Sequence, residues 1–435
     1  MIPRRLFGVL ALCVAAASGC GSGPGAGDAA AEARFTREVA WAGRGTWIKV
    51  DTHVHTTFSD GAHSVADVVA KAIEHGCRAI AITDHADRNL KAASAEYEAA
   101  IQGLRSAHPD VVILAGLEWN VPPWDGDEHA VVLVPPGPNE WRTLAEFKER
   151  FDDFKRADEN KVIVEEALKW LAENGGDRGL PPVVVYDHPS RKDAKSIENV
   201  ADIERWYAVN DLVVSFEGGP GHQGKTPLGS YDYKEELIDR WDPVVARVGD
   251  AWDTLLQKGI DIGGALATSD FHNADRNGLG DFWPGQFSET WLYVPEVTAA
   301  GVLRALRAGA LVGVHGHIAR NVELTVEAGG LDRAAIPGEA IEVAPGSSVT
   351  VTLSADVAER DWQNQPNRID AVELIAIAKK AGIVANRPPL AGRQIFREVV
   401  AVPESGIVLR ARGRRTIADA PDLMFYTNPI RVSVR

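Results

Sequence analysis

Short apolar runs rich in β-branched residues alternate with amphipathic helical stretches between residues 46 and 316 of this 435-residue chain. The runs that read as strands lie at residues 46–51, 78–83, 111–116, 130–134, 182–187, 211–217 and 260–268. Helices are expected after Ser64, which has the position of an N-cap, and over residues 140–155, 160–174, 195–208 and 235–258. This alternation predicts an α/β fold with a parallel sheet, either open or closed into a barrel.

The pattern changes after about residue 316. Short alternating runs such as "VELTVE" and "SSVTVTLSA" then follow one another, separated by Gly, Pro and Asn. Consecutive strands without intervening helices predict a small C-terminal all-β, sandwich-like domain over residues 317–435. The α/β part would occupy residues 46–316.

The amino terminus has the order of a secretory signal. Arg4 and Arg5 precede an apolar run at residues 6–17, which is too short to span a bilayer as a stable helix. The following "ASGC" resembles a bacterial lipobox, so we expect a lipoprotein signal peptide at residues 1–19, a lipid anchor at Cys20 and a flexible tether over residues 20–45. An ordinary signal peptide cut nearby is the alternative. Either way the protein would be extracytoplasmic, and in the lipoprotein case the lipid would hold it at the cell envelope.

Charge and cysteine content narrow the possible partners. The formal net charge is −15, so the chain would gain nothing from counterion release on nucleic acid, and we expect no nucleic-acid-binding groove. After removal of Cys13 and lipidation of Cys20, Cys77 has no intramolecular partner. No disulfide framework is therefore expected, and Cys77 is predicted to be a buried structural thiol.

Side chains that bind metals lie mostly just past the predicted strand ends. In parallel barrels the carboxyl ends of the strands form the rim where catalytic groups converge. A mixture of imidazole and carboxylate suits Zn, Mn or Fe better than Ca or Mg, and this number of groups exceeds what one catalytic metal takes, so we expect two or three divalent ions. The predicted ligands are His53, His55, Asp60, His85, Glu118, His129, His188, Asp270 and His272.

For other residues near the same strand ends, the sequence leaves two possible roles each. Arg191 could bind an anionic phosphate through two hydrogen bonds, or form a surface salt bridge. His222 and Glu217 could contact substrate, or order a loop. Asp84 could orient a ligand, or cap a turn.

Trp119 and the pair His315 and His317 are further candidates. Trp119 directly follows Glu118 and is the best candidate for packing against a substrate ring. His315 and His317 form a second H-x-H pair, but no carboxylate lies near them in the sequence, and we interpret them as a chance pair.

The segments "DTHVHTTFSDG", "AITDH", "GLE", "DHPSR" and "TSDFH" occur in this order. Together they resemble the polymerase-and-histidinol-phosphatase (PHP) superfamily of metal-dependent hydrolases over roughly residues 46–315. The resemblance implies a distorted (β/α)7 barrel with a trinuclear metal centre. It also makes His63 a weaker candidate ligand, since some members have a histidine near the position of Asp60.

The resemblance distributes the predicted ligands over three metals. One metal would be held by His53, His55, Glu118 and Asp270; a second would share Glu118 and take His129 and His188; the third would take Asp60, His85 and His272. We place Asp270, His272, Arg191 and His222 in catalytic roles.

A narrower similarity extends beyond the ligands. "FEGGPGHQG", residues 288–316 and the terminal "FYTNPIRV" resemble the CehA/McbA-type branch, which includes secreted hydrolases of aryl carbamates and esters. The leading prediction is hydrolysis of a small phosphoester by a metal-bridging hydroxide. Hydrolysis of aryl carbamates or carboxylic esters is the alternative, and a non-catalytic binding module of the envelope is the alternative from another class.

Overall fold

The computed structural model describes residues 32–122, 128–152, 162–190, 196–221, 239–275 and 280–435. The predicted signal peptide, Cys20, Arg191 and His222 lie outside the described residues. Within the described part, Glu32–Arg435 belong to one compact unit.

The predicted strands of the α/β part are present and lie side by side in chain order. They are β2 (Thr46–Asp51), β3 (Cys77–Ile82), β4 (Val112–Asn120), β5 (His129–Leu133), β6 (Val183–Asp187), β7 (Val213–Gly219) and β8 (Gly263–Ala267). Strand β5 runs antiparallel to both β4 and β6, while the other neighbouring pairs from β2 to β8 are parallel. The expectation of a wholly parallel sheet is therefore wrong at β5.

The α/β class is confirmed, whereas closure of the sheet into a barrel is not established. On its other side β2 pairs with β9 (Ser288–Val294), which pairs with β10 (Leu311–His315), both antiparallel. The hydrogen-bonded order of the described strands ends at β8. Strand β8 meets β9 through a side chain, because the Thr290 hydroxyl both accepts from the Ala267 N–H and donates to its carbonyl.

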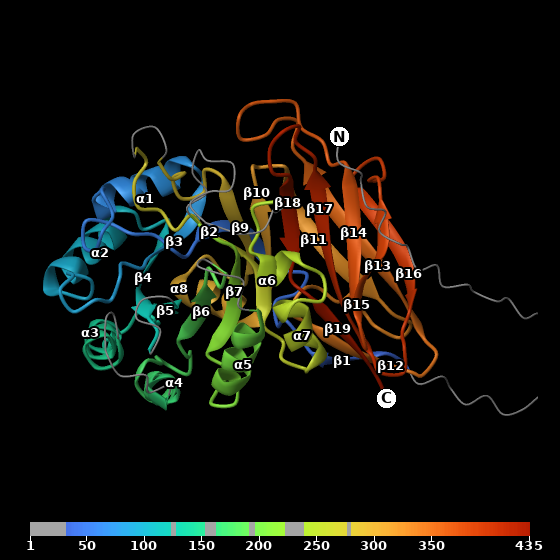
Figure 1. The fold of residues 1–435 in the computed structure, drawn as a ribbon, viewed down its shortest axis with the longest axis horizontal. Coiled ribbons are helices and arrows are strands. Elements are labelled where there is room, and N and C mark those ends of the chain that lie inside the picture. Colours follow the sequence, from blue (N-terminus) through green and yellow to red (C-terminus); the bar gives the residue numbers. More distant parts are fainter. Residues whose placement is uncertain (1–31, 123–127, 153–161, 191–195, 222–238, 276–279) are drawn as a thin grey trace, which may run out of the picture. The chain divides into compact units, whose positions relative to one another are not determined.

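Helices cover this sheet (Figure 1). Helix α1 (Val65–Glu74) begins with the predicted cap, a capping box in which Ser64 and Asp67 each bind the other's backbone N–H. The others are α2 (Ala95–Ala107), α3 (Glu140–Phe151), α4 (Val162–Asn174), α5 (Ser196–Tyr207), α6 (Pro243–Ala246), α7 (Ala251–Gln257) and α8 (Ala299–Ala308). Arg307 of α8 donates hydrogen bonds to Pro182 and Asp211, which precede β6 and β7, so α8 covers the amino ends of these strands. Their carboxyl ends stay available for a site.

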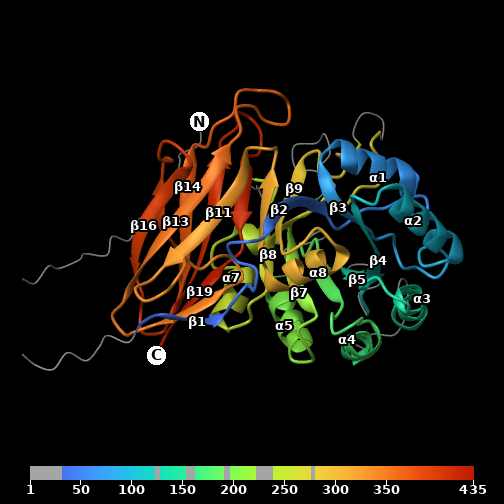
Figure 2. The ribbon, with the colours of Figure 1, turned by 180° about the vertical axis from the view of Figure 1, so that it is seen from behind.

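The C-terminal part is all-β, as predicted (Figure 2). A three-stranded sheet contains β11 (Ala319–Glu327), β13 (Ser348–Val357) and β16 (Gln394–Ala401). A hydrophobic cluster joins its buried face to the second layer, because alternate residues of β13 such as Val351 and Leu353 share a core with Leu374 and Leu409. The second layer contains β1 (Arg34–Arg37), β12 (Ala340–Val343), β14 (Ala371–Ile377), β15 (Ala381–Arg387), β17 (Ile407–Arg415), β18 (Leu423–Thr427) and β19 (Ile430–Val434).

The two parts share one continuous sheet, since β10 of the α/β part pairs with β18. The predicted domain boundary near residue 316 remains a prediction. Part of the segment predicted as a tether over residues 20–45 is ordered: Arg34–Arg37 form β1, which pairs with β12, and the Val39 side chain is buried. Apolar contacts and strand pairing order these residues, which composition alone did not indicate.

Candidate metal centre

The predicted ligands gather at one edge of the α/β sheet. His53, His55 and Asp60 follow β2, His85 follows β3, His188 follows β6, and Asp270 and His272 follow β8. Glu118 lies inside β4 rather than after it, because β4 continues to Asn120. His129 begins β5, and the antiparallel direction of β5 brings this amino end to the edge formed by the carboxyl ends of β4 and β6.

Glu118 is the central side chain of the group. Its Oε1 lies 2.5 Å from His129 Nδ1 and 3.1 Å from His188 Nε2. Its Oε2 lies 3.1 Å from His55 Nε2 and 2.9 Å from His85 Nδ1. Each oxygen of one buried carboxylate thus faces two imidazoles, which is the arrangement a bridging ligand requires.

His53, His55 and Asp270 converge on a second point. The two Nε2 atoms of His53 and His55 are 3.1 Å apart, and they lie 3.4 Å and 3.1 Å from Asp270 Oδ1. All three side chains are buried. Nitrogen lone pairs and a carboxylate that face one another in a buried space form a donor set that a cation satisfies.

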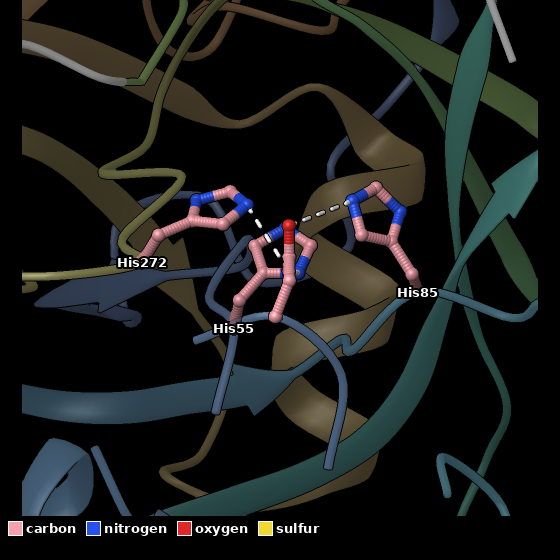
Figure 3. A group of neighbouring side chains, drawn as sticks. His55, His85 and His272 are labelled. Atoms are coloured by element: carbon pink, nitrogen blue, oxygen red, sulfur yellow. Dashed lines mark ion pairs between the residues drawn. The ribbon is translucent and has the colours of Figure 1, made fainter. Parts of the chain in front are cut away.

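The third group is the most accessible. The ring of His55 lies between those of His85 and His272, with ring centroids 4.6 Å and 3.9 Å away (Figure 3). Asp60 Oδ1 is 3.4 Å from His272 Nε2, and Asp60 Oδ2 is 3.9 Å from His85 Nε2. The Asp60 side chain is 52% exposed, so this group is the most exposed part of the centre among the described residues.

Asp84 orders the loop that carries His55. It accepts hydrogen bonds from the Thr56 N–H at 2.8 Å and from the Ser59 hydroxyl at 2.6 Å. Ser59 Oγ in turn lies 3.3 Å from His55 Nδ1. Of the two roles considered for Asp84, the structure supports the orienting one, because Asp84 reaches His55 through Ser59.

Two of the predicted ligands have unusual backbones. His188 and Asp270 have φ values of 27° and 42°, in the left-handed region that residues other than glycine rarely adopt. Next to Asp270, a Cβ on Gly221 would stand 1.9 Å from the Asp270 Cβ, so only glycine fits there. Such strain persists where the surroundings over-determine it, and it concentrates at functional sites.

The electrostatics of the site favour positive charge. Burial by itself would lower the pKa of His55, but the adjoining Asp270 and Glu118 carboxylates raise it to about 10. Burial likewise opposes ionisation of Glu118, yet the imidazoles, His129 foremost, hold its pKa well below the usual range. The carboxylates therefore stabilise positive charge in the site, and a divalent ion would supply it.

The buried carboxylate of Asp187 tests whether the residues present fit metal ions. Asp187 is 1% exposed, and neither of its carboxylate oxygens has a hydrogen-bond partner among the described residues. Its ligand atom lies within 4.8 Å of those of His53 and Glu217. Burying an ionised carboxylate without a partner costs several kcal/mol of folding free energy. A bound cation, or a proton, must offset that cost. The residues present therefore fit metal ions.

Asp187 was not predicted from the sequence, and Glu217 was predicted either to contact substrate or to order a loop. Glu217 accepts from His53 and lies in β7 rather than in the loop after it. Asp187 directly precedes His188, as Asp84 precedes His85. An acid immediately before a ligand histidine at a strand end was the available signal.

His63, His315, His317 and Cys77 lie outside the groups of candidate metal ligands among the described residues. His63 packs against Phe271 and Trp283 and belongs to none of the ligand groups found among the described residues. The same is true of His315 and His317, in keeping with a chance pair. Cys77 is buried as predicted, and burial raises the pKa of its thiol.

The role proposed for Trp119 is wrong. Its side chain is fully buried, its indole N–H donates to the Phe151 carbonyl at 2.8 Å, and its ring meets Phe147 edge to face. Successive residues of a strand point to opposite faces, so Glu118 and Trp119 cannot both face the site.

The geometry thus defines a candidate multi-metal centre at the carboxyl end of an α/β sheet. The sequence model of the PHP domain matches residues 51–180, which include His53, His55, Asp60, His85, Glu118 and His129. An uncharacterized protein of Methanocaldococcus jannaschii is 38% identical over 78 residues, which are 18% of this chain and 36% of that protein. The chain thus spans about a third of the length of this curated relative.

Solved structures also match this chain, at TM-scores below 0.5. A two-domain protein of Bacteroides vulgatus, described as containing a predicted PHP-like metal-dependent phosphoesterase, is 14% identical with a TM-score of 0.40. The match covers 94% of this chain and 100% of that one. An amidohydrolase of Chromobacterium violaceum is 16% identical with a TM-score of 0.32, covering 53% of this chain and 89% of that one.

Proposed function

We propose that this protein is a metal-dependent hydrolase and that it cleaves phosphoesters. The observation that carries the proposal is the convergence of Glu118 with four imidazoles at 2.5–3.1 Å in a buried site. The PHP domain match over residues 51–180 supports the same class. Divalent metals, two or three per chain, would lower the pKa of a bound water and stabilise charge that develops on the substrate.

Each ligand group would have its own part in this function. Glu118 would bridge two ions, with His53, His55 and Asp270 on one side and His129 and His188 on the other. Asp60, His85 and His272 would hold the third ion. Because Asp60 is half exposed, substrate would approach from this third group.

The chain's own residues would keep the site rigid and its donors correctly aimed. Asp84 fixes the loop of His55 through Thr56 and Ser59. Burial of His53, Glu118 and Asp270 excludes bulk water, so that electrostatic interactions with a bound phosphoester are strong. Arg191 and His222, outside the described residues, remain proposed substrate contacts.

A metal and substrate screen tests the proposal. Purified protein is analysed for Zn, Mn and Fe, and the loaded protein is assayed on aryl phosphates, nucleotides, aryl carbamates and aryl carboxylic esters. Stoichiometric metal with turnover of a phosphoester supports the proposal. Turnover of carbamates or carboxylic esters alone would favour the alternative that the CehA/McbA resemblance suggests. A protein without stoichiometric metal would be the non-catalytic binding module.

We further propose that the mature protein is held at the cell envelope by a lipid on Cys20. The support is the order of charged, apolar and small residues that ends at Cys20. Among the described residues, none of the helices is both long and apolar enough to cross a membrane. Cys20→Ala should block processing or release the protein from the membrane fraction, and a fully processed variant that stays there would contradict the anchor.

A further inference from the structure

Glu217 has a set of contacts that differs from those of the predicted ligands. It lies in β7 with its side chain fully buried. Its Oε1 accepts from the Thr268 hydroxyl and lies 2.9 Å from His53 Nδ1, and its Oε2 accepts from the His188 backbone N–H at 3.0 Å. Three donors from three different loops therefore meet on this one carboxylate.

The contact with His53 decides which ring nitrogen is free. A carboxylate can only accept from an imidazole, so in the neutral form that binds metal His53 would carry its proton on Nδ1 and its lone pair on Nε2. That Nε2 faces the site, 3.5 Å from Glu118 Oε1 and 3.4 Å from Asp270 Oδ1. Glu217 thus holds His53 in the tautomer and orientation that a metal ligand needs.

The contact with His188 acts on the backbone instead. His188 has a φ of 27°, a strained conformation that the surroundings must hold. The hydrogen bond from its N–H to Glu217 Oε2 supports this conformation, in which its Nε2 lies 3.1 Å from Glu118 Oε1. One carboxylate therefore supports the imidazole of one predicted ligand and the backbone of another.

We propose that Glu217 is a positioning residue that couples the two metal positions flanking Glu118. It acts through His53 and His188, and its two oxygens already accept from three donors. Asp187, in the same group, is the contrasting case because its oxygens lack hydrogen-bond partners among the described residues. This inference rests on the proposed function, namely that the centre binds metal.

Glu217→Gln is the most direct test. Glutamine keeps the size of the side chain, but its NH₂ group must face either His53 or His188 as a second donor. Loss of an outer-shell partner of a metal ligand weakens metal binding by roughly 10- to 100-fold. We expect that loss for Co²⁺, titrated into metal-free protein and followed by its visible absorption. Thr268→Val should give a smaller loss, and Thr268→Ser should restore wild-type binding.

Glu140→Gln is the matched control. Glu140 is a buried carboxylate that accepts from Arg105, away from the site, so its loss tests for general destabilisation. The thermal midpoint of each metal-free variant is measured alongside. A purely structural role would lower the midpoint of Glu217→Gln and leave its Co²⁺ dissociation constant unchanged.

The outcomes separate this inference from the function on which it rests. Wild-type Co²⁺ affinity in Glu217→Gln overturns the positioning role alone. Absence of Co²⁺ binding to the wild-type protein overturns the proposed function, and the positioning role with it. Weaker binding in Glu217→Gln with normal binding in Glu140→Gln supports both.

Discussion

Arg410 of β17 and Asp253 of α7 form a bidentate ion pair in the interior of the protein. Arg410 Nε lies 2.9 Å from Asp253 Oδ1, and Arg410 Nη2 lies 3.1 Å from Asp253 Oδ2. Both side chains are fully buried, and the guanidinium lies 4.4 Å from the ring centroid of Trp252. The pair therefore links the C-terminal β region to a helix of the α/β part.

Breaking this pair should destabilise the whole protein. Asp253→Asn leaves the Arg410 charge buried without its counter-ion, and the loss of one partner of such a pair costs about 3–5 kcal/mol. The free energy of unfolding, measured by denaturant titration, should fall by that amount. Glu74→Gln, which removes the exposed pair with Lys71, is the control and should leave the free energy of unfolding nearly unchanged. Equal effects of the two substitutions would contradict the importance of the buried pair.

Glu118 should be the ligand whose loss affects two metal positions together. Glu118→Gln keeps the shape but removes the charge that faces His55, His85, His129 and His188. We expect the variant to lose metal from two positions and to lose hydrolysis, as measured by metal content per chain and an aryl ester assay. His272→Ala should weaken only the third position and keep part of the activity. Full metal and full turnover in Glu118→Gln would show that the site is assigned wrongly.

Removal of metal should destabilise the folded protein. Without cations, the buried carboxylates of Glu118, Asp187 and Asp270 lose the charge that offsets their burial. An ion at 100 times its dissociation constant stabilises the folded state by about 2.7 kcal/mol per site. Dialysis against a chelator should therefore lower the thermal midpoint, and added Zn²⁺ or Mn²⁺ should restore it. An unchanged midpoint would be inconsistent with metal binding in the folded state.

Asp239 should make stability depend on pH. Burial raises its pKa to about 6, although the Arg412 charge and the hydrogen bonds from the Trp241 N–H and the Tyr426 hydroxyl oppose the shift. The folded state then holds a proton that the unfolded state releases near pH 4, so the contribution of this group falls as pH rises from about 4 to 6. Relative to Asp239→Asn, metal-free wild type should lose roughly 2–3 kcal/mol of unfolding free energy across that window.

Denaturant titrations of both proteins from about pH 4 to about pH 7.5 measure this difference. Asp110→Asn, at an exposed position, is the control substitution. A constant difference between wild type and Asp239→Asn over the whole range would refute the prediction.

The sequence determined the elements and most of the chemistry, because both depend on local pattern. Alternating apolar runs gave the strands from β2 to β8, and Ser64 with Asp67 marked the start of α1. The predicted ligands gather because carboxyl ends of parallel strands share one edge of a sheet. The sequence also indicated the all-β C-terminal part, through short alternating strands without helices.

Only the tertiary structure decided the direction of each strand and the face of the sheet on which each side chain lies. The antiparallel direction of β5 brings His129 to the site, and the length of β4 puts Glu118 inside the strand with Trp119 on the other face. The contact of His53 with Glu217 joins residues 164 positions apart, and that of Arg410 with Asp253 joins residues 157 apart. No local periodicity encodes such pairs, because they form only when the packed sheet brings distant strand ends together.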